Sequence, residues 1–164
     1  MSAILYRQAT EDDLPAVAGM YARLDAHYRQ FSYQFPKIEN APQLWVESFR
    51  RTLGRFCVLC LAEGENQLLG FVLGRLKRIQ PYLGGFLVGE LSDVWVEPQA
   101  RGLGVGEKLN RLTIAWLQQN GARSVEAQIL TGNDPIWHLY EKIGFKPELR
   151  QVRLLLDDGF NPDA

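Results

Sequence analysis

The feature that most constrains the fold of this sequence is an apolar strand that leads into a glycine-rich turn and then a helix. The strand is expected to end within residues 93–98, and Gly102, Gly104 and Gly106 follow at alternate positions. Three such glycines cost backbone entropy, which suggests that something approaches the backbone closely. The free amides and positive dipole end of the helix that follows suit an anion such as phosphate. We therefore interpret this loop as an anion-binding element.

Two nucleotide-binding loops have related patterns, and the sequence matches neither. A Walker loop ends in Lys followed by Ser or Thr, and this loop has no such pair. A dinucleotide loop needs a further glycine where Glu107 stands. It also opens the first βαβ unit of its domain, whereas this loop follows several strands. A nucleotide-binding protein is therefore the weaker alternative.

Hydrophobic periodicity and turn residues predict the element order β-α-α-β-β-β-α-β-α-β. Early hairpins and late helix crossovers favour an α/β fold with a central mixed sheet and helices on both faces. We expect a single domain over residues 1–164, with a polar tail from about 157 to 164. The expected strands are 3–8, 55–62, 67–80, 86–96, 124–130 and 150–156, and the expected helices are 11–29, 42–53, 102–120 and 135–143.

The charge balance and hydropathy of the chain argue against several other classes. Its 18 Lys and Arg residues against 19 Asp and Glu give a net charge of −1, so no basic surface for nucleic acid is expected. No apolar run reaches the ~20 residues that a membrane span needs, and the first residues lack a signal-peptide pattern. We therefore expect a cytoplasmic protein that binds neither nucleic acid nor a membrane.

Cys57 and Cys60 form a C-x-x-C pattern inside an apolar run. Side chains three apart on a strand point to opposite faces, so the two thiols are not expected to meet. No second Cys or His pair completes a zinc site. We predict two core cysteines and no metal site.

The glycine loop also belongs to a longer pattern. Arg101 precedes it in the order R-x-x-G-x-G, and further along the chain Asn133 precedes a helix that carries Tyr140 and ends in Gly144 and Phe145. Both segments and the element order resemble the GNAT superfamily of N-acetyltransferases, which use acetyl-CoA. The resemblance covers nearly the whole chain and implies that superfamily's three-layer fold. It also allows a homodimer.

The resemblance implies an acyltransferase that moves an acetyl group from acetyl-CoA to a primary amine of a small molecule or peptide by direct attack. The cofactor pyrophosphate is then expected on the loop amides, and its pantetheine arm along the preceding strand. A non-catalytic acyl-CoA-binding regulatory domain is the alternative. The residues expected to bind the cofactor are Trp95, Val96, Arg101, Gly102, Leu103, Gly104, Val105, Gly106 and Asn133.

By the same resemblance, Tyr140 is the acid that protonates the leaving sulfur, with simple packing as the alternative role. A phenol has a pKa of ~10, so it still holds its proton at neutral pH. The general base is expected on the strand before the loop, with Glu90 as first candidate and Asp93 as second. Strand alternation separates the faces of Glu90 and Asp93, unless a bulge intervenes.

The acceptor is expected where the sequence is most irregular, at residues 25–36 and 78–85. The first segment holds several aromatic residues, His27 and Asp25, which would suit an ammonium group by cation–π attraction and charge. Packing of these aromatic residues on the sheet is the alternative. The sequence leaves protein N-termini, lysines, polyamines, aminoglycosides and amino acids all open as acceptors.

Overall fold

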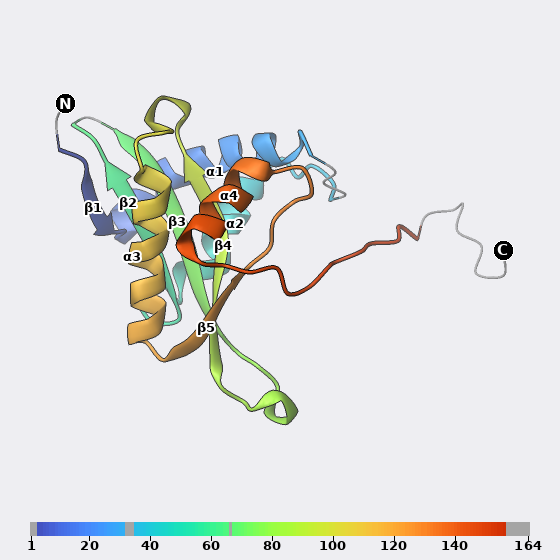
Figure 1. Cartoon of the computed structure of the whole chain (residues 1–164). Coiled ribbons are helices and arrows are strands. Elements are labelled where there is room, and N and C mark those ends of the chain that lie inside the picture. Colours follow the sequence, from blue (N-terminus) through green and yellow to red (C-terminus); the bar gives the residue numbers. More distant parts are fainter. Residues whose placement is uncertain (1–2, 32–34, 66, 157–164) are drawn as a thin grey trace.

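A mixed sheet in the order β1-β2-β3-β4-β5 forms the centre of the computed structural model, which describes residues 3–31, 35–65 and 67–156 (Figure 1). The first four strands pair antiparallel, and β5 pairs parallel to β4. This confirms the predicted mixed sheet. The strands are β1 Leu5–Gln8, β2 Cys57–Glu63, β3 Leu68–Arg78, β4 Leu87–Val96 and β5 Ala122–Ala127.

Helices cover both faces of the sheet, as predicted. Figure 1 shows α1 and α2 on one face and α3 and α4 on the other. Their bounds are α1 Leu14–Tyr28, α2 Ala41–Arg50, α3 Val105–Gln119 and α4 Asp134–Ile143. Within the described ranges, none of the helices is both long and apolar enough to cross a bilayer.

Each face of the sheet has its own core, because side chains alternate along the strands. Leu59 and Phe71 pack with α1 and α2, whereas Val58 and Val72 pack with α3. The two cysteines follow the same rule. Cys57 lies in the first core and Cys60 in the second, both as free thiols, which confirms their structural role.

A network of charged side chains fixes the entry into α1. Arg7 on β1 donates two hydrogen bonds of 2.8 Å to the carboxylate of Asp13, and its Nε donates to Glu63 at 2.7 Å. Asp13 also accepts a hydrogen bond from the backbone amide of Thr10 at 2.8 Å. Hydrogen bonds from Arg7 lower the pKa of Asp13 to about 2.

The predicted strand at 150–156 is wrong, since this described segment forms no strand. It runs away from the sheet (Figure 1), and Val152, Leu154 and Leu156 are exposed. Alternating apolar residues favour a strand only where a neighbouring backbone supplies hydrogen bonds. The prediction for β5 also ended too late, because residues 128–130 leave the sheet. The polar tail at 157–164 lies outside the described residues.

Candidate active site

The last part of β4 has a free edge. Its parallel pairing with β5 runs from Leu87 opposite Ala122 only to Leu91 opposite Ala127, whereas pairing with β3 continues to Val96. Within the described ranges, no backbone hydrogen bond joins the rest of β4 to the segment after β5. The two strands therefore diverge and leave a groove along which this part of β4 has no partner strand on one side.

The glycine loop lies at the end of this groove. Gly102 and Gly104 have positive φ angles of 77° and 79°, a conformation that side chains strain. No heavy atom lies within 4 Å of the position that a Cβ would take at either residue. The loop leads directly into the 15-residue helix α3, whose dipole is positive at this end. The backbone is thus open to a ligand at the point that most favours an anion.

Arg101 is held at the same place by its own contacts. Its Nε donates a hydrogen bond of 2.9 Å to the carbonyl oxygen of Val96, and its guanidinium carbon lies 4.8 Å from the ring centre of Trp95. The side chain therefore folds back over the end of β4. Its positive charge stays beside the glycine loop.

A cavity of about 980 Å³ fills the space between the diverging strands and the surrounding helices. Its size falls within the range typical of ligand sites. Of the residues expected to bind the cofactor, Leu103 is exposed and does not line the cavity. The others do: Trp95, Val96, Arg101, Gly102, Gly104, Val105, Gly106 and Asn133.

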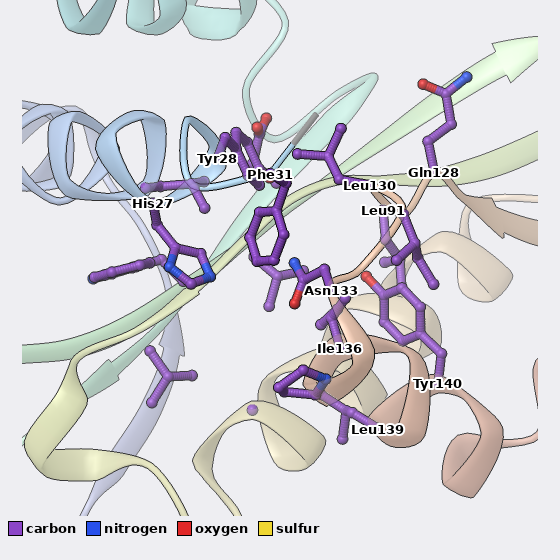
Figure 2. Close-up of a pocket in the computed structure, with 18 of the residues that line it drawn as sticks. His27, Tyr28, Phe31, Leu91, Gln128, Leu130, Asn133, Ile136, Leu139 and Tyr140 are labelled. Atoms are coloured by element: carbon purple, nitrogen blue, oxygen red, sulfur yellow. The ribbon is translucent and has the colours of Figure 1, made fainter. Parts of the chain in front are cut away.

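Tyr140 on α4 faces the same cavity. Its ring is buried and packs against Phe145 with the ring centres 4.9 Å apart. Figure 2 shows its hydroxyl pointing toward Leu91 on β4. Burial raises the pKa of Tyr140, and the charge of Asp93 raises it further. The phenol therefore holds its proton well beyond neutral pH.

A bulge in β4 determines the face of the sheet to which Asp93 points. Leu73 lies opposite Asp93 and Gly74 opposite Leu91, so Ser92 has no partner on β3. The extra residue reverses the alternation. Leu91 packs in the core on the face of the sheet covered by α3 and α4. Asp93 points to the opposite face, toward α2.

Asp93 lines the cavity and is held from α2. Trp45 Nε1 donates a hydrogen bond to its Oδ2 at 2.9 Å. Burial raises the pKa of Asp93 above its ordinary value, while the hydrogen bond from Trp45 and the charge of Arg75 oppose this rise. The charge of Glu90 adds to it. A carboxylate with a raised pKa can accept a proton near neutral pH.

Glu90 has a different setting. Its Oε2 lies 2.6 Å from Lys77 Nζ, and the same ammonium also pairs with Glu126 on β5. Glu90 does not line the cavity. The structure thus brings Asp93 and Tyr140 to one cavity and leaves Glu90 in an ion-pair cluster beside it.

The two segments expected to hold the acceptor have different positions. His27, Phe31 and Phe35 line the cavity, whereas Asp25 pairs with Arg29 at 3.1 Å and does not. Tyr33 lies outside the described residues. No residue of 78–85 lines the cavity, because this hairpin precedes β4 and the glycine loop follows it (Figure 1).

Some lining residues carried no signal in the sequence. The sequence predicts one strand over Gln128 and Leu130 and another over Gln151 and Arg153, yet all four line the cavity. Gln128 Nε2 donates a hydrogen bond to Gln151 Oε1 at 3.1 Å, which brings the C-terminal segment to the cavity. Trp45 was read only as an apolar helix residue, and no sequence pattern connects it with Asp93.

Sequence comparison identifies the family of the chain. Residues 20–145 match the model of the "Acetyltransferase (GNAT) family". The chain is 31% identical over 137 residues to a mycothiol acetyltransferase of Saccharomonospora viridis, covering 82% of this chain and 42% of that protein. It is 37% identical over 92 residues to a glucosamine 6-phosphate N-acetyltransferase of Trypanosoma brucei brucei, covering 54% and 60%. The match thus spans less than two thirds of either relative.

Structural comparison agrees on the fold. A solved structure from Clostridium acetobutylicum, described as a predicted acetyltransferase with acetyl-CoA, superposes with a TM-score of 0.77 at 19% identity. The match covers 94% of this chain and 97% of that one. Together with the family match, these findings show that the chain belongs to the GNAT acetyltransferase family.

Proposed function

We propose that this protein transfers an acetyl group from acetyl-CoA to a primary amine of a small molecule. The observation that carries the proposal is the joint lining of one cavity by the glycine loop, the free edge of β4 and Tyr140. The relatives named for mycothiol and glucosamine 6-phosphate acetylation support a small-molecule acceptor. A single domain over 1–164, a cytoplasmic location and a homodimer are further parts of the prediction.

The cofactor fits the groove by its chemistry. A pyrophosphate needs several hydrogen-bond donors and positive potential, which the loop amides, the start of α3 and Arg101 supply. A pantetheine arm contains two amides, which suit the unpaired edge of β4 near Trp95 and Val96. Asn133, at the start of α4, lines the other side of the cavity. The Clostridium acetobutylicum structure, described with acetyl-CoA, supports this choice of acyl donor.

Two side chains can act as the general base and the general acid of the reaction. Asp93 accepts the proton of the ammonium group, and the neutral amine then attacks the thioester carbonyl carbon. As the carbon–sulfur bond breaks, Tyr140 gives its proton to the sulfur. The phenolate then regains a proton from the attacking nitrogen, which becomes the neutral amide, and Asp93 releases its proton to solvent. Asp93 stands ahead of Glu90, the first candidate from the sequence, because Asp93 lines the cavity and Glu90 is paired with Lys77.

Calorimetric titration of the purified protein with acetyl-CoA tests the proposal, with ATP and NAD as controls. Binding at micromolar concentrations, with neither control binding, is the expected result. Release of free thiol in the presence of amines would then establish transfer. Tight binding without any thiol release across amines would support the non-catalytic acyl-CoA-binding alternative. Absence of acetyl-CoA binding would refute the proposal.

A further inference from the structure

Part of the cavity is lined mostly by apolar and aromatic side chains. We call this part the acceptor end. It comprises Tyr28 and Phe31 at the end of α1, Phe35 in the loop that follows, Gln128 and Leu130 after β5, and Arg153 in the C-terminal segment.

Phe31 presents an aromatic surface inside this space. Its ring packs against the edge of His27 with the ring centres 5.2 Å apart, and its Cδ1 atom lies beside Gly132 across the cavity. Figure 2 shows Phe31 standing between His27 and Asn133. The ring therefore reaches from α1 to the loop before α4, where a ligand has to contact it.

Among the described residues, few carboxylates line the cavity. Asp25, the acid that the sequence places nearest, is paired with Arg29 and lies outside the lining. Glu107 lines the opposite end, at the glycine loop, where it pairs with Lys142 and Arg111. Among the described lining residues this leaves Asp93 as the one carboxylate near the reacting centre. Asp93 can receive one ammonium group.

A positively charged lining residue, Arg153, lies beside Phe35. The guanidinium carbon of Arg153 lies 4.4 Å from the ring centre of Phe35. The face of Phe35 that could attract a cation is thus already covered by one. Burial and the charge of Arg101 lower the pKa of His27, so this imidazole adds no positive charge at neutral pH. A second ammonium group on an acceptor would meet Arg153.

We propose that the acceptor is an amine with one positive charge and an apolar, preferably aromatic, body. The ammonium group goes to Asp93, and the body packs on Phe31 and Leu130. Polyamines and aminoglycosides are disfavoured, because among the described lining residues no further carboxylate lies near Asp93 to bind their additional charges. This inference rests on the proposed acetyl transfer and narrows it to a class of acceptor.

Steady-state kinetics with three kinds of amine test the inference. 2-Phenylethylamine is the aromatic monoamine, ethylamine lacks the ring, and spermidine and kanamycin carry several charges. We expect kcat/KM for 2-phenylethylamine to exceed that for ethylamine and for both polycations by about 30-fold, as burial of a phenyl ring allows. Equal or higher kcat/KM for either polycation or for ethylamine would overturn the inference.

Variants separate the acceptor end from the cofactor groove. Phe31→Ala should raise KM for 2-phenylethylamine about 10-fold, while the Kd for acetyl-CoA stays unchanged. Phe31→Leu keeps an apolar side chain and should give a smaller rise in the same direction, and it serves if the alanine variant fails to fold. Tyr82→Ala removes an exposed aromatic residue of the 78–85 hairpin and is the matched control. Weaker acetyl-CoA binding with an unchanged amine KM in the Phe31 variants would contradict the assignment.

A charge reversal at Arg153 tests the exclusion of polycations. Arg153→Glu should raise kcat/KM for spermidine about 10-fold and leave that for 2-phenylethylamine unchanged. No change with spermidine would refute the role of Arg153. Failure of the inference is distinct from failure of the proposed function. If the protein binds acetyl-CoA but turns over none of these amines, the acceptor class is wrong, whereas absence of acetyl-CoA binding removes the proposed function itself.

Discussion

The indole Nε1 of Trp45 donates a hydrogen bond to Asp93 Oδ2 across 2.9 Å, and this contact joins α2 to the strand that borders the cofactor groove. Tyr21 on α1 stacks on the same indole with the ring centres 4.4 Å apart. The carboxylate is therefore fixed from the helical layer behind the sheet. Its charge in turn raises the pKa of Tyr140. A carboxyl group and a phenol that line the same cavity thus influence each other.

Trp45→Phe should move the acid limb of the kcat/KM profile to higher pH. The hydrogen bond stabilises the charged form of Asp93, so its loss raises the pKa of that carboxyl. Arg75 and Glu90 also face Asp93, and the substitution leaves both in place. Trp116→Phe alters a buried indole on the opposite face of the sheet and should leave the limb unmoved. An unshifted limb in Trp45→Phe would exclude Asp93 as the titrating base.

Tyr140→Phe should lower kcat by about 100-fold and leave the Kd for acetyl-CoA nearly unchanged, because it removes a proton donor and keeps the ring. Since burial raises the pKa of Tyr140, wild-type activity should not fall at mildly basic pH through loss of this proton. Tyr6→Phe, on β1, is the matched control. A Tyr140→Phe variant with wild-type kcat would assign the residue to packing alone.

Gly104→Glu should abolish acetyl-CoA binding, because a carboxylate would occupy the open space above the loop and repel phosphate. The substitution also places a side chain at a φ of 79°. Gly54→Glu has nearly the same backbone angle of 78° and lies outside the cavity, so it controls for strain alone. Calorimetry should show binding to the Gly54 variant only. Retained affinity in a folded Gly104 variant would remove the loop from the cofactor site.

Asp13→Asn should lower the free energy of unfolding by about 1–2 kcal/mol at pH 7, because it breaks the pairing with Arg7. The folded-state pKa of Asp13 lies below its unfolded value, so the stabilisation is present above about pH 4. It is lost as the pH falls toward 2. Urea unfolding at pH 7 and pH 3 measures the difference, which should shrink at the lower pH. Asp12→Asn, at an exposed neighbouring position, should change little.

The glycine loop could be predicted because its information is local. Alternate glycines between a strand and a helix specify an open backbone at a helix start, and Gly102 and Gly104 have the positive φ angles that this requires. The bulge at Ser92 could not be predicted. It depends on how β4 pairs with β3, and it moves Asp93 to the face that simple alternation did not give it. The bulge therefore places the side chains of Asp93 and Leu91 on opposite faces of the sheet.

Contacts between distant residues account for the other differences. Trp45 and Asp93 are 48 positions apart, and only the packing of α2 brings them together. The apolar alternation at 150–156 predicted a strand, yet pairing needs a partner that the pattern does not specify. Gln128 and Arg153 line the cavity, since the segments that hold them lie outside the sheet and do not form the predicted strands.

Pairing between β4 and β5 stops before β4 ends. The last part of β4, an interior strand of the sheet, therefore has a free edge like that of an edge strand. Free amides and carbonyls on an exposed edge invite pairing with other chains. If pantetheine amides take those positions, the acyl donor acts as a short additional strand. The amide hydrogens in the last part of β4 that face the groove should then exchange slowly with solvent only when acetyl-CoA is present. Depletion of the donor would leave this protein more prone to aggregate, so its persistence would depend on the supply of its own substrate.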